Sequence, residues 1–310
     1  MNKRSVKIRH LYLRYVSSFI LHPSEILHPS DLSFHLPSPY NQGNFISAIR
    51  GTIMRRWLTA IPVYNEAAHV QSVLAEVRKY SPHILVVDDG STDGTGEILR
   101  KLAVCECSTH PGGIHRLTHP KNRGYGAALI SAFDYFLKRD FDVLVTMDCD
   151  GQHEPSRIPL LLEALDDCDI VSGSRYLRDF RQDTPAPIDR RAINGIVTRE
   201  INERYGLELT DAFCGFKAYR REAVEKLHIT ETGWGMPLQL WVQAARLGLR
   251  IKEVGVPRIY LDPKRAFGGM LNDADARLDY YRGVLTAAES DPRFTADSPC
   301  ELLGCWERCP

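Results

Sequence analysis

The sequence predicts an α/β fold with a mostly parallel central sheet and helices on both faces. Short apolar runs of strand length alternate with segments whose apolar residues recur at helical spacing, and this alternation is typical of parallel β-α units. Right-handed crossovers would bring the carboxyl ends of the strands to one edge of the sheet. Polar motifs follow three of the predicted strands, so the sequence also indicates a ligand site at that edge.

The amino-acid composition limits the functions that the chain could have. The chain has 310 residues, a quarter of them charged, and its formal net charge is zero, so nothing in the overall charge favours binding to nucleic acid. No apolar stretch approaches the roughly 20 residues of a membrane-spanning helix. The eight cysteines are scattered without a Cys-x-x-Cys motif, which favours free thiols in a reducing compartment. We therefore expect a cytoplasmic protein.

The first 55 residues differ from the rest of the chain. They are rich in Lys, Arg, Ser, Pro and His, and they show no sustained helical or strand period. This composition is typical of a targeting segment or a disordered arm. The other interpretation is a start codon placed too far upstream, with Met54 as the natural start. We expect the folded domain to cover residues 56–289 and residues 290–310 to form a loose C-terminal tail.

The individual elements follow from the spacing of apolar residues. The predicted strands are Trp57–Val63, Ile84–Val87, a run from Val143, Ile170–Tyr176 with its turn, and Ile251–Val256. The predicted helices are Ala67–Lys79, a segment running toward Leu102, Ala127–Leu137, Pro155–Leu165, Asp189–Tyr205, a segment through Leu238 and Ala245, and Leu271–Ala288. We expect Ser91 or Thr92 to cap the helix that runs toward Leu102, because a hydroxyl can accept an unpaired N–H of the first turn.

Two carboxylates follow the strand that begins at Val143. Asp148 and Asp150 are two residues apart, a spacing that places side chains on the same face of a strand, and Gly151 permits a sharp turn behind them. Hard oxygen ligands at a strand end suit Mg²⁺ or Mn²⁺ that holds a diphosphate. A solvated turn with two surface acids is the alternative. The motifs Pro62–Glu66 and Asp88–Ser91 at other strand ends favour the ligand site.

In this order, the motifs resemble those of glycosyltransferase family 2, whose nucleotide-sugar-binding fold is called GT-A. The resemblance covers about Trp57–Leu285. The segments that carry it are Pro62–Glu66, Val87–Asp93, Asp148–Asp150 with Gln152 and His153, Gly173–Tyr176, and Asp211–Tyr219. The last two segments are similar to those of dolichyl-phosphate mannosyltransferases and their bacterial polyprenyl-phosphate relatives.

The resemblance implies a role for each site residue. The donor pocket would be lined by Pro62, Tyr64, Glu66, Asp88, Asp89, Gly124, Asp148 and Gln152. Asp148 and Asp150 would hold Mg²⁺ or Mn²⁺ on the donor diphosphate. The residues that act on the phosphates during catalysis would be Asp150, Arg175, Arg190 and Arg265, since a guanidinium offers paired donors to phosphate oxygens. For each arginine, an ion pair that holds the fold is the alternative.

The resemblance also implies the reaction. It is the inverting, metal-dependent transfer of a hexose from a nucleotide sugar, GDP-mannose or UDP-glucose, to a polyprenyl or dolichyl phosphate at a membrane surface. Family members that glycosylate hydroxyls resemble one another in placing an acid near the start of a late helix. The corresponding stretch here, Gly233–Trp241, has no carboxylate, and Glu231 lies upstream of it. A phosphate acceptor is already anionic and needs no base.

Two other functions remain open at this point. One keeps the donor chemistry but uses a soluble hydroxyl acceptor. The stretch Arg265–Gly268 leaves this open, because it matches the acceptor loop of the family only in part. Gly269 and Met270 follow it where Ser-Lys is common in the family. The other is a non-catalytic nucleotide-sugar-binding protein, against which the intact acids argue. The sequence leaves the donor sugar and the oligomeric state open.

Overall fold

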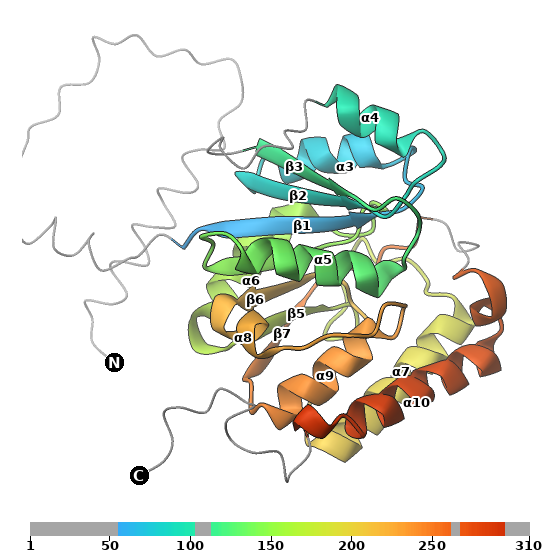
Figure 1. Ribbon diagram of the computed structural model, residues 1–310. Coiled ribbons are helices and arrows are strands. Elements are labelled where there is room, and N and C mark those ends of the chain that lie inside the picture. Colours follow the sequence, from blue (N-terminus) through green and yellow to red (C-terminus); the bar gives the residue numbers. More distant parts are fainter. Residues whose placement is uncertain (1–54, 103–112, 262–266, 295–310) are drawn as a thin grey trace, which may run out of the picture. The chain divides into compact units, whose positions relative to one another are not determined.

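The computed structural model describes residues 55–102, 113–261 and 267–294 of the chain (Figure 1). The predicted N-terminal arm up to residue 54, the tail from residue 295 and Arg265 lie outside the described residues. Within the described part, none of the helices combines the length and the apolar character needed to cross a bilayer.

The described residues form a seven-stranded, mostly parallel sheet. Its strands are β1 (Trp57–Val63), β2 (His83–Asp88), β3 (Gly113–Thr118), β4 (Val143–Thr146), β5 (Ile170–Ser174), β6 (Lys217–Arg220) and β7 (Ile251–Gly255). Their order across the sheet is β3-β2-β1-β4-β6-β5-β7. Only β6 runs antiparallel to its neighbours, with Thr146 of β4 opposite Lys217. The predicted fold class is confirmed, while β3 and the reversed β6 were not predicted.

Helices cover both faces of this sheet, as expected. They are α3 (Val70–Val77), α4 (Thr95–Lys101), α5 (Tyr125–Leu137), α6 (Ile158–Ala164), α7 (Ile188–Tyr205), α8 (Arg221–Lys226), α9 (Met236–Arg246) and α10 (Ala274–Glu289). Four 3-10 turns accompany them: η3 (Pro155–Arg157), η4 (Leu165–Asp167), η5 (Gly269–Asn272) and η6 (Pro292–Phe294). α7 and α10 lie side by side (Figure 1).

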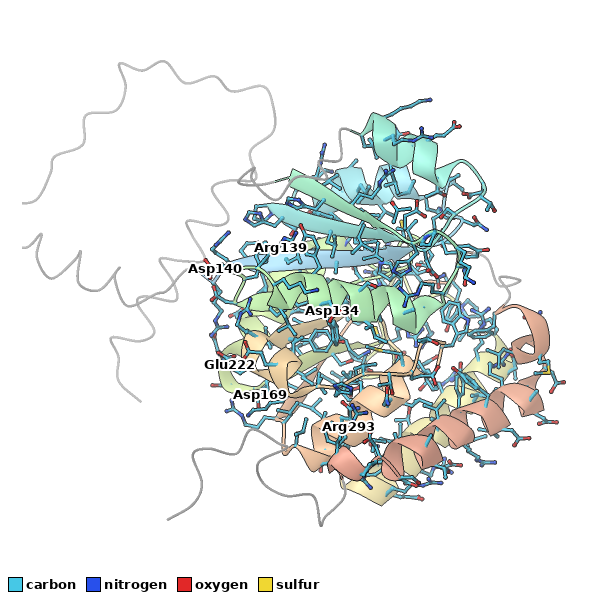
Figure 2. All side chains as sticks on the ribbon, viewed as in Figure 1. Asp134, Arg139, Asp140, Asp169, Glu222 and Arg293 are labelled. Atoms are coloured by element: carbon cyan, nitrogen blue, oxygen red, sulfur yellow. The ribbon has the colours of Figure 1, made fainter. Side chains whose placement is uncertain are left out.

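Two apolar cores, one on each face, explain why the central strands β1 and β4 are mainly apolar. Along β1, Leu58 and Ala60 belong to one core, whereas Ile61 and Val63 belong to the other. A strand buried on both faces shows a continuous apolar run instead of an alternating pattern. Helix α5, by contrast, buries one side and keeps Asp134 exposed on the other (Figure 2).

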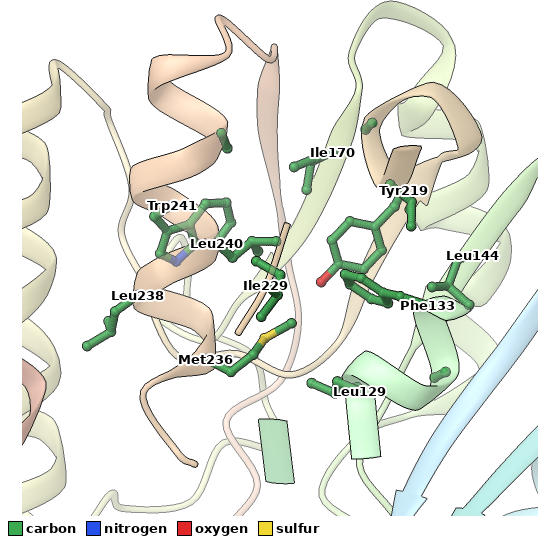
Figure 3. Close-up of a cluster of buried hydrophobic side chains, with 14 of the residues drawn as sticks. Leu129, Phe133, Leu144, Ile170, Tyr219, Ile229, Met236, Leu238, Leu240 and Trp241 are labelled. Carbon is green, nitrogen blue, oxygen red and sulfur yellow. The ribbon is translucent and has the colours of Figure 1, made fainter. Parts of the chain in front are cut away.

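One of the two cores contains residues of helices α5, α9 and α10. Figure 3 shows Phe133 of α5 beside Tyr219 of β6, and their rings meet edge to face with centroids 5.4 Å apart. Trp241 of α9 is fully buried, and its indole N–H donates to the carbonyl of Ala212 at 2.8 Å. This bond ties α9 to the segment that precedes β6.

Two local predictions need correction. Ser91 and Thr92 do not cap α4, because the helix begins later, at Thr95, after Gly94. The Ser91 hydroxyl instead accepts the N–H of Asn65 at 3.0 Å, and Asp93 accepts the N–H of Thr95 at 3.0 Å. Near the other end of the domain, Phe294 is buried, five residues beyond the end predicted for the folded domain.

Candidate active site

A cavity of about 760 Å³ lies at the carboxyl edge of the sheet. Ten of the residues proposed from sequence line it: Pro62, Tyr64, Glu66, Asp89, Gly124, Asp148, Asp150, Gln152, Arg175 and Arg190. Asp88 is not among the lining residues, because its carboxylate turns back to accept the N–H of Ser91 at 3.0 Å. The structure thus brings together residues spread over about 130 positions of the sequence.

The carboxylate of Asp89 holds the backbone of a neighbouring loop at the edge of the cavity. Its carboxylate accepts the N–H groups of Arg123 at 2.9 Å and Gly124 at 2.8 Å, and it meets Nδ1 of His119 at 2.6 Å. Gly124 has a φ of 105°, and a side chain there would come within 2.4 Å of the carbonyl oxygen of Thr232. The glycine is therefore required both by its backbone conformation and by the close approach of the loop that precedes α9.

The two predicted metal ligands share the cavity but not a strand. β4 ends at Thr146, so the loop, and not strand alternation, directs Asp148 and Asp150 into the cavity. Asp148 Oδ1 accepts a hydrogen bond from the Tyr125 hydroxyl at 3.0 Å. Asp150 accepts the N–H of Gln152 at 3.0 Å and its side-chain amide at 2.7 Å.

This donor set fits a hard divalent cation that arrives with a ligand. Within the described segments, no group of three or more His, Cys, Asp and Glu side chains is arranged to hold a metal ion. Mg²⁺ is commonly bound by one or two carboxylates together with substrate phosphates and water. Two carboxylates on one cavity wall suit that mode, in which a diphosphate supplies the other ligands.

His153 lies behind the acid pair. Its Nδ1 lies 3.1 Å from the backbone N of Asp148, and its Nε2 lies 3.8 Å from Asp148 Oδ2. The ring also stacks on Phe216, with centroids 5.3 Å apart. His153 thus contacts both the backbone and the carboxylate of Asp148.

Two of the predicted arginines differ in what they contact. Arg175 donates to Asp211 through Nε at 2.6 Å and through Nη2 at 2.9 Å, and the Asp211 side chain is fully buried. This is the fold-holding ion pair that stood as the alternative, and a role for Arg175 toward phosphate stays a prediction. Arg190 lines the cavity near the start of α7, with its guanidinium 4.7 Å from the centroid of Phe267.

Arg277 is a cavity residue that the sequence interpretation missed. It is 2 % exposed, it donates to Asp189 at 2.5 Å and to the carbonyl of Leu271 at 2.7 Å, and its guanidinium lies 4.6 Å from the centroid of Phe267. Its signal was present in the sequence, because an arginine interrupts the buried apolar stripe of the last helix. A buried charge needs partners, so such an interruption indicates a specific role.

Three aromatic rings among the cavity-lining residues contact one another in sequence. Tyr125 stacks on Trp234 with centroids 5.0 Å apart and an interplanar angle of 13°, and Trp234 meets Phe267 edge to face at 5.7 Å. Burial raises the pKa of the Tyr125 hydroxyl well above its usual value, and the Asp148 charge adds to this effect, so the hydroxyl stays protonated and donates. All three rings line the cavity.

Comparison with solved structures shows the class of protein that this fold and site define. The crystal structure of glucosyl-3-phosphoglycerate synthase from Mycobacterium tuberculosis, in complex with Mn²⁺, UDP and glucosyl-3-phosphoglycerate, has a similar fold. The TM-score is 0.57 at 19 % sequence identity, over 83 % of this chain and 86 % of that chain. Together with the family model described next, this likeness shows a glycosyltransferase with a GT-A fold. More narrowly, the chain belongs to glycosyltransferase family 2, because the family model described as "Glycosyl transferase family 2" matches residues 59–228.

Curated relatives support the same placement. Undecaprenyl-phosphate mannosyltransferase of Micrococcus luteus is 36 % identical over 226 residues, which are 71 % of this chain and 90 % of that protein. Polyprenol monophosphomannose synthase of Mycolicibacterium smegmatis is 33 % identical over 213 residues, or 65 % of this chain and 77 % of that protein. The resemblance drawn from the motifs, including the branch within the family, is confirmed.

Proposed function

We propose that this glycosyltransferase moves a hexose from a nucleotide sugar to a polyprenyl phosphate at a membrane surface, with inversion of the anomeric carbon. The names of both relatives, an undecaprenyl-phosphate mannosyltransferase and a polyprenol monophosphomannose synthase, support a polyprenyl phosphate acceptor. The observation that carries the proposal is the chemistry of the cavity. The described residues that line the cavity include paired carboxylates, arginines and aromatic rings, and none of those near the start of α9 is a carboxylate.

The acid side suits the donor. Asp148 and Asp150 would hold Mg²⁺ or Mn²⁺ on the diphosphate, and the metal would neutralise the negative charge that develops on the departing nucleoside diphosphate. Glu66, which is 6 % exposed, and Pro62 lie at the end of β1 on the cavity wall, where they would contact the nucleoside. Binding measurements with GDP-mannose and with UDP-glucose would identify the nucleoside.

The other side suits a phosphate acceptor better than a hydroxyl. A hydroxyl nucleophile needs a positioned base, which typically contributes about 10²–10⁴-fold to the rate. Near the start of α9 the cavity is lined by Trp234 and Pro237. The nearby Glu231 is not among the lining residues, and its Oε1 already accepts the N–H of Gly233 at 2.6 Å and the Tyr280 hydroxyl at 2.7 Å. A phosphate needs cations instead, and Arg190 and Arg277 both line this part of the site.

Replacing Arg190 tests the acceptor site. We expect Arg190→Ala to raise the KM for a short polyprenyl phosphate about 10- to 100-fold, because a hydrogen bond to a charged group contributes about 1.5–3 kcal/mol. The KM for the nucleotide sugar should change little. Steady-state kinetics with each substrate varied in turn make the comparison.

Arg191→Ala is the matched control, because Arg191 is the next residue of α7, is exposed and is not among the cavity-lining residues. Its acceptor KM should stay at the wild-type value. An Arg190→Ala variant whose donor KM rises while its acceptor KM is unchanged would place this arginine on the donor and contradict the assignment.

A further inference from the structure

Asp148 is held from three sides. The Tyr125 hydroxyl donates to Oδ1 at 3.0 Å, and Nε2 of His153 lies 3.8 Å from Oδ2. Behind the carboxylate, a side chain at position 215 would lie only 2.5 Å from Oδ2, and glycine there leaves the space that the carboxylate occupies. Tyr125 and His153 both line the cavity, and of these three neighbours Tyr125 is the one whose side chain donates a hydrogen bond to the carboxylate at 3.0 Å.

The position of the Tyr125 ring is itself determined by two elements. Tyr125 is the first residue of α5, and the next turn of that helix is tied to the loop before α9 by the bond from the N–H of Ala127 to the carbonyl of Thr232 at 3.0 Å. A side chain at Gly126 would come within 2.2 Å of the carbonyl of Glu231, so the two backbones are in close contact. The ring then stacks on Trp234 from the same loop. The hydroxyl is thus presented to Asp148 by a ring with little freedom to move.

We propose that Tyr125 is a positioning residue for the metal site, whose hydroxyl holds the Asp148 carboxylate in the orientation that binds the divalent cation. The Oδ1 atom of Asp148 accepts from the tyrosine, and the Asp148 side chain also lines the cavity. Partners of this kind around metal ligands typically change metal affinity or activity about 10- to 100-fold when they are removed. This inference rests on the proposed function, because it assumes that Asp148 binds a metal.

Tyr125→Phe isolates the hydroxyl, since the phenyl ring preserves the stacking on Trp234. The measurement is the affinity for Mn²⁺, read from the signal of free Mn²⁺ in electron paramagnetic resonance, with GDP and with UDP in separate titrations. We expect the variant to bind Mn²⁺ about 10- to 100-fold more weakly than the wild type, at an unchanged melting temperature. Raising the Mn²⁺ concentration should restore kcat, which a merely structural defect would not allow.

Tyr135→Phe is the matched control, because Tyr135 lies on the same helix, loses the same atom and is not among the cavity-lining residues. Its Mn²⁺ affinity should equal that of the wild type. A second variant, Trp234→Leu, keeps the hydroxyl but removes the stacking partner, and it should weaken Mn²⁺ binding in the same direction. Mn²⁺ affinity in Tyr125→Phe within twofold of the wild type, or an equal loss in Tyr135→Phe, overturns the inference while leaving the proposed function intact. Absence of Mn²⁺ binding by the wild type with either nucleotide contradicts both.

Discussion

Replacing Asp148 or Asp150 by asparagine is expected to reduce turnover at least about a hundredfold while leaving the melting temperature close to that of the wild type. Both side chains line the cavity, and asparagine keeps the shape of the aspartate and one oxygen that accepts hydrogen bonds. What each variant loses is a negative charge toward the cation. A metal that stabilises the developing charge of a leaving group contributes several kcal/mol, and each 1.36 kcal/mol corresponds to a tenfold change in rate.

Asp134→Asn is the control for these variants. Asp134 is exposed on α5 (Figure 2) and is not among the cavity-lining residues, so the same chemical change should leave turnover unaltered. Rates are measured with Mn²⁺ present and after chelation. Near-normal turnover of both asparagine variants, with or without the chelator, would remove the metal role from this pair.

The largest effect on stability is expected from Asp211→Ala. The carboxylate of Asp211 is fully buried, and it accepts hydrogen bonds from Arg175, Asn194 and the backbone N–H of Phe213. Removing it leaves the Arg175 guanidinium, which is only 18 % exposed, without its partner. Breaking a buried ion pair in this way typically costs about 3–5 kcal/mol. Urea denaturation at pH 7 measures the change in the free energy of unfolding.

The same carboxylate predicts how this cost depends on pH. Burial raises the pKa of Asp211, but the charge and hydrogen bonds of Arg175 outweigh burial and hold the pKa at about 2. In the unfolded chain an aspartate titrates near pH 3.9. Between these values the unfolded state binds the proton first, so the stability that Asp211 contributes is complete above about pH 5 and is lost as the pH falls toward 2. The difference between wild type and Asp211→Ala should therefore be about 1 kcal/mol smaller at pH 3 than at pH 7.

Asp169→Asn is the control for the buried pair. Asp169 also pairs with an arginine, Arg250, but that arginine is 62 % exposed, and exposed ion pairs contribute at most about 1 kcal/mol (Figure 2). A loss of stability in Asp211→Ala no larger than that in Asp169→Asn would show that the Arg175–Asp211 pair does not hold the fold.

Much of the site was predictable because its signals are local in the sequence. Pro62–Glu66 and Asp148–Asp150 each follow a short apolar strand, and the handedness of β-α units requires the strand ends to meet at one edge. The elements β1 and α5 were predicted to within two residues for the same reason, since their apolar spacing is regular. The choice of the carboxyl edge as the site thus needed no knowledge of long-range contacts.

The features that sequence reasoning missed depend on partners far apart in the chain. Strand β6 is short and is stabilised by β4 and β5, which lie many residues upstream, so its reversed direction could not be read from its own residues. Arginine is a residue type that often binds phosphate, and only the fold shows that the Arg175 guanidinium is paired with Asp211. Tyr125 lay just before the helix predicted from Ala127, and only the fold places its hydroxyl against Asp148.

The central claim is that a phosphate, and not a hydroxyl, receives the sugar. The most direct measurement incubates the purified protein with Mn²⁺ and GDP-mannose or UDP-glucose, offering either a short polyprenyl phosphate or the free alcohol of the same chain length. Because the described residues that line the cavity include arginines but no carboxylate near the start of α9, we expect transfer to the phosphate to be at least about a hundredfold faster than transfer to the alcohol. Transfer to the alcohol without transfer to the phosphate would contradict the proposed function.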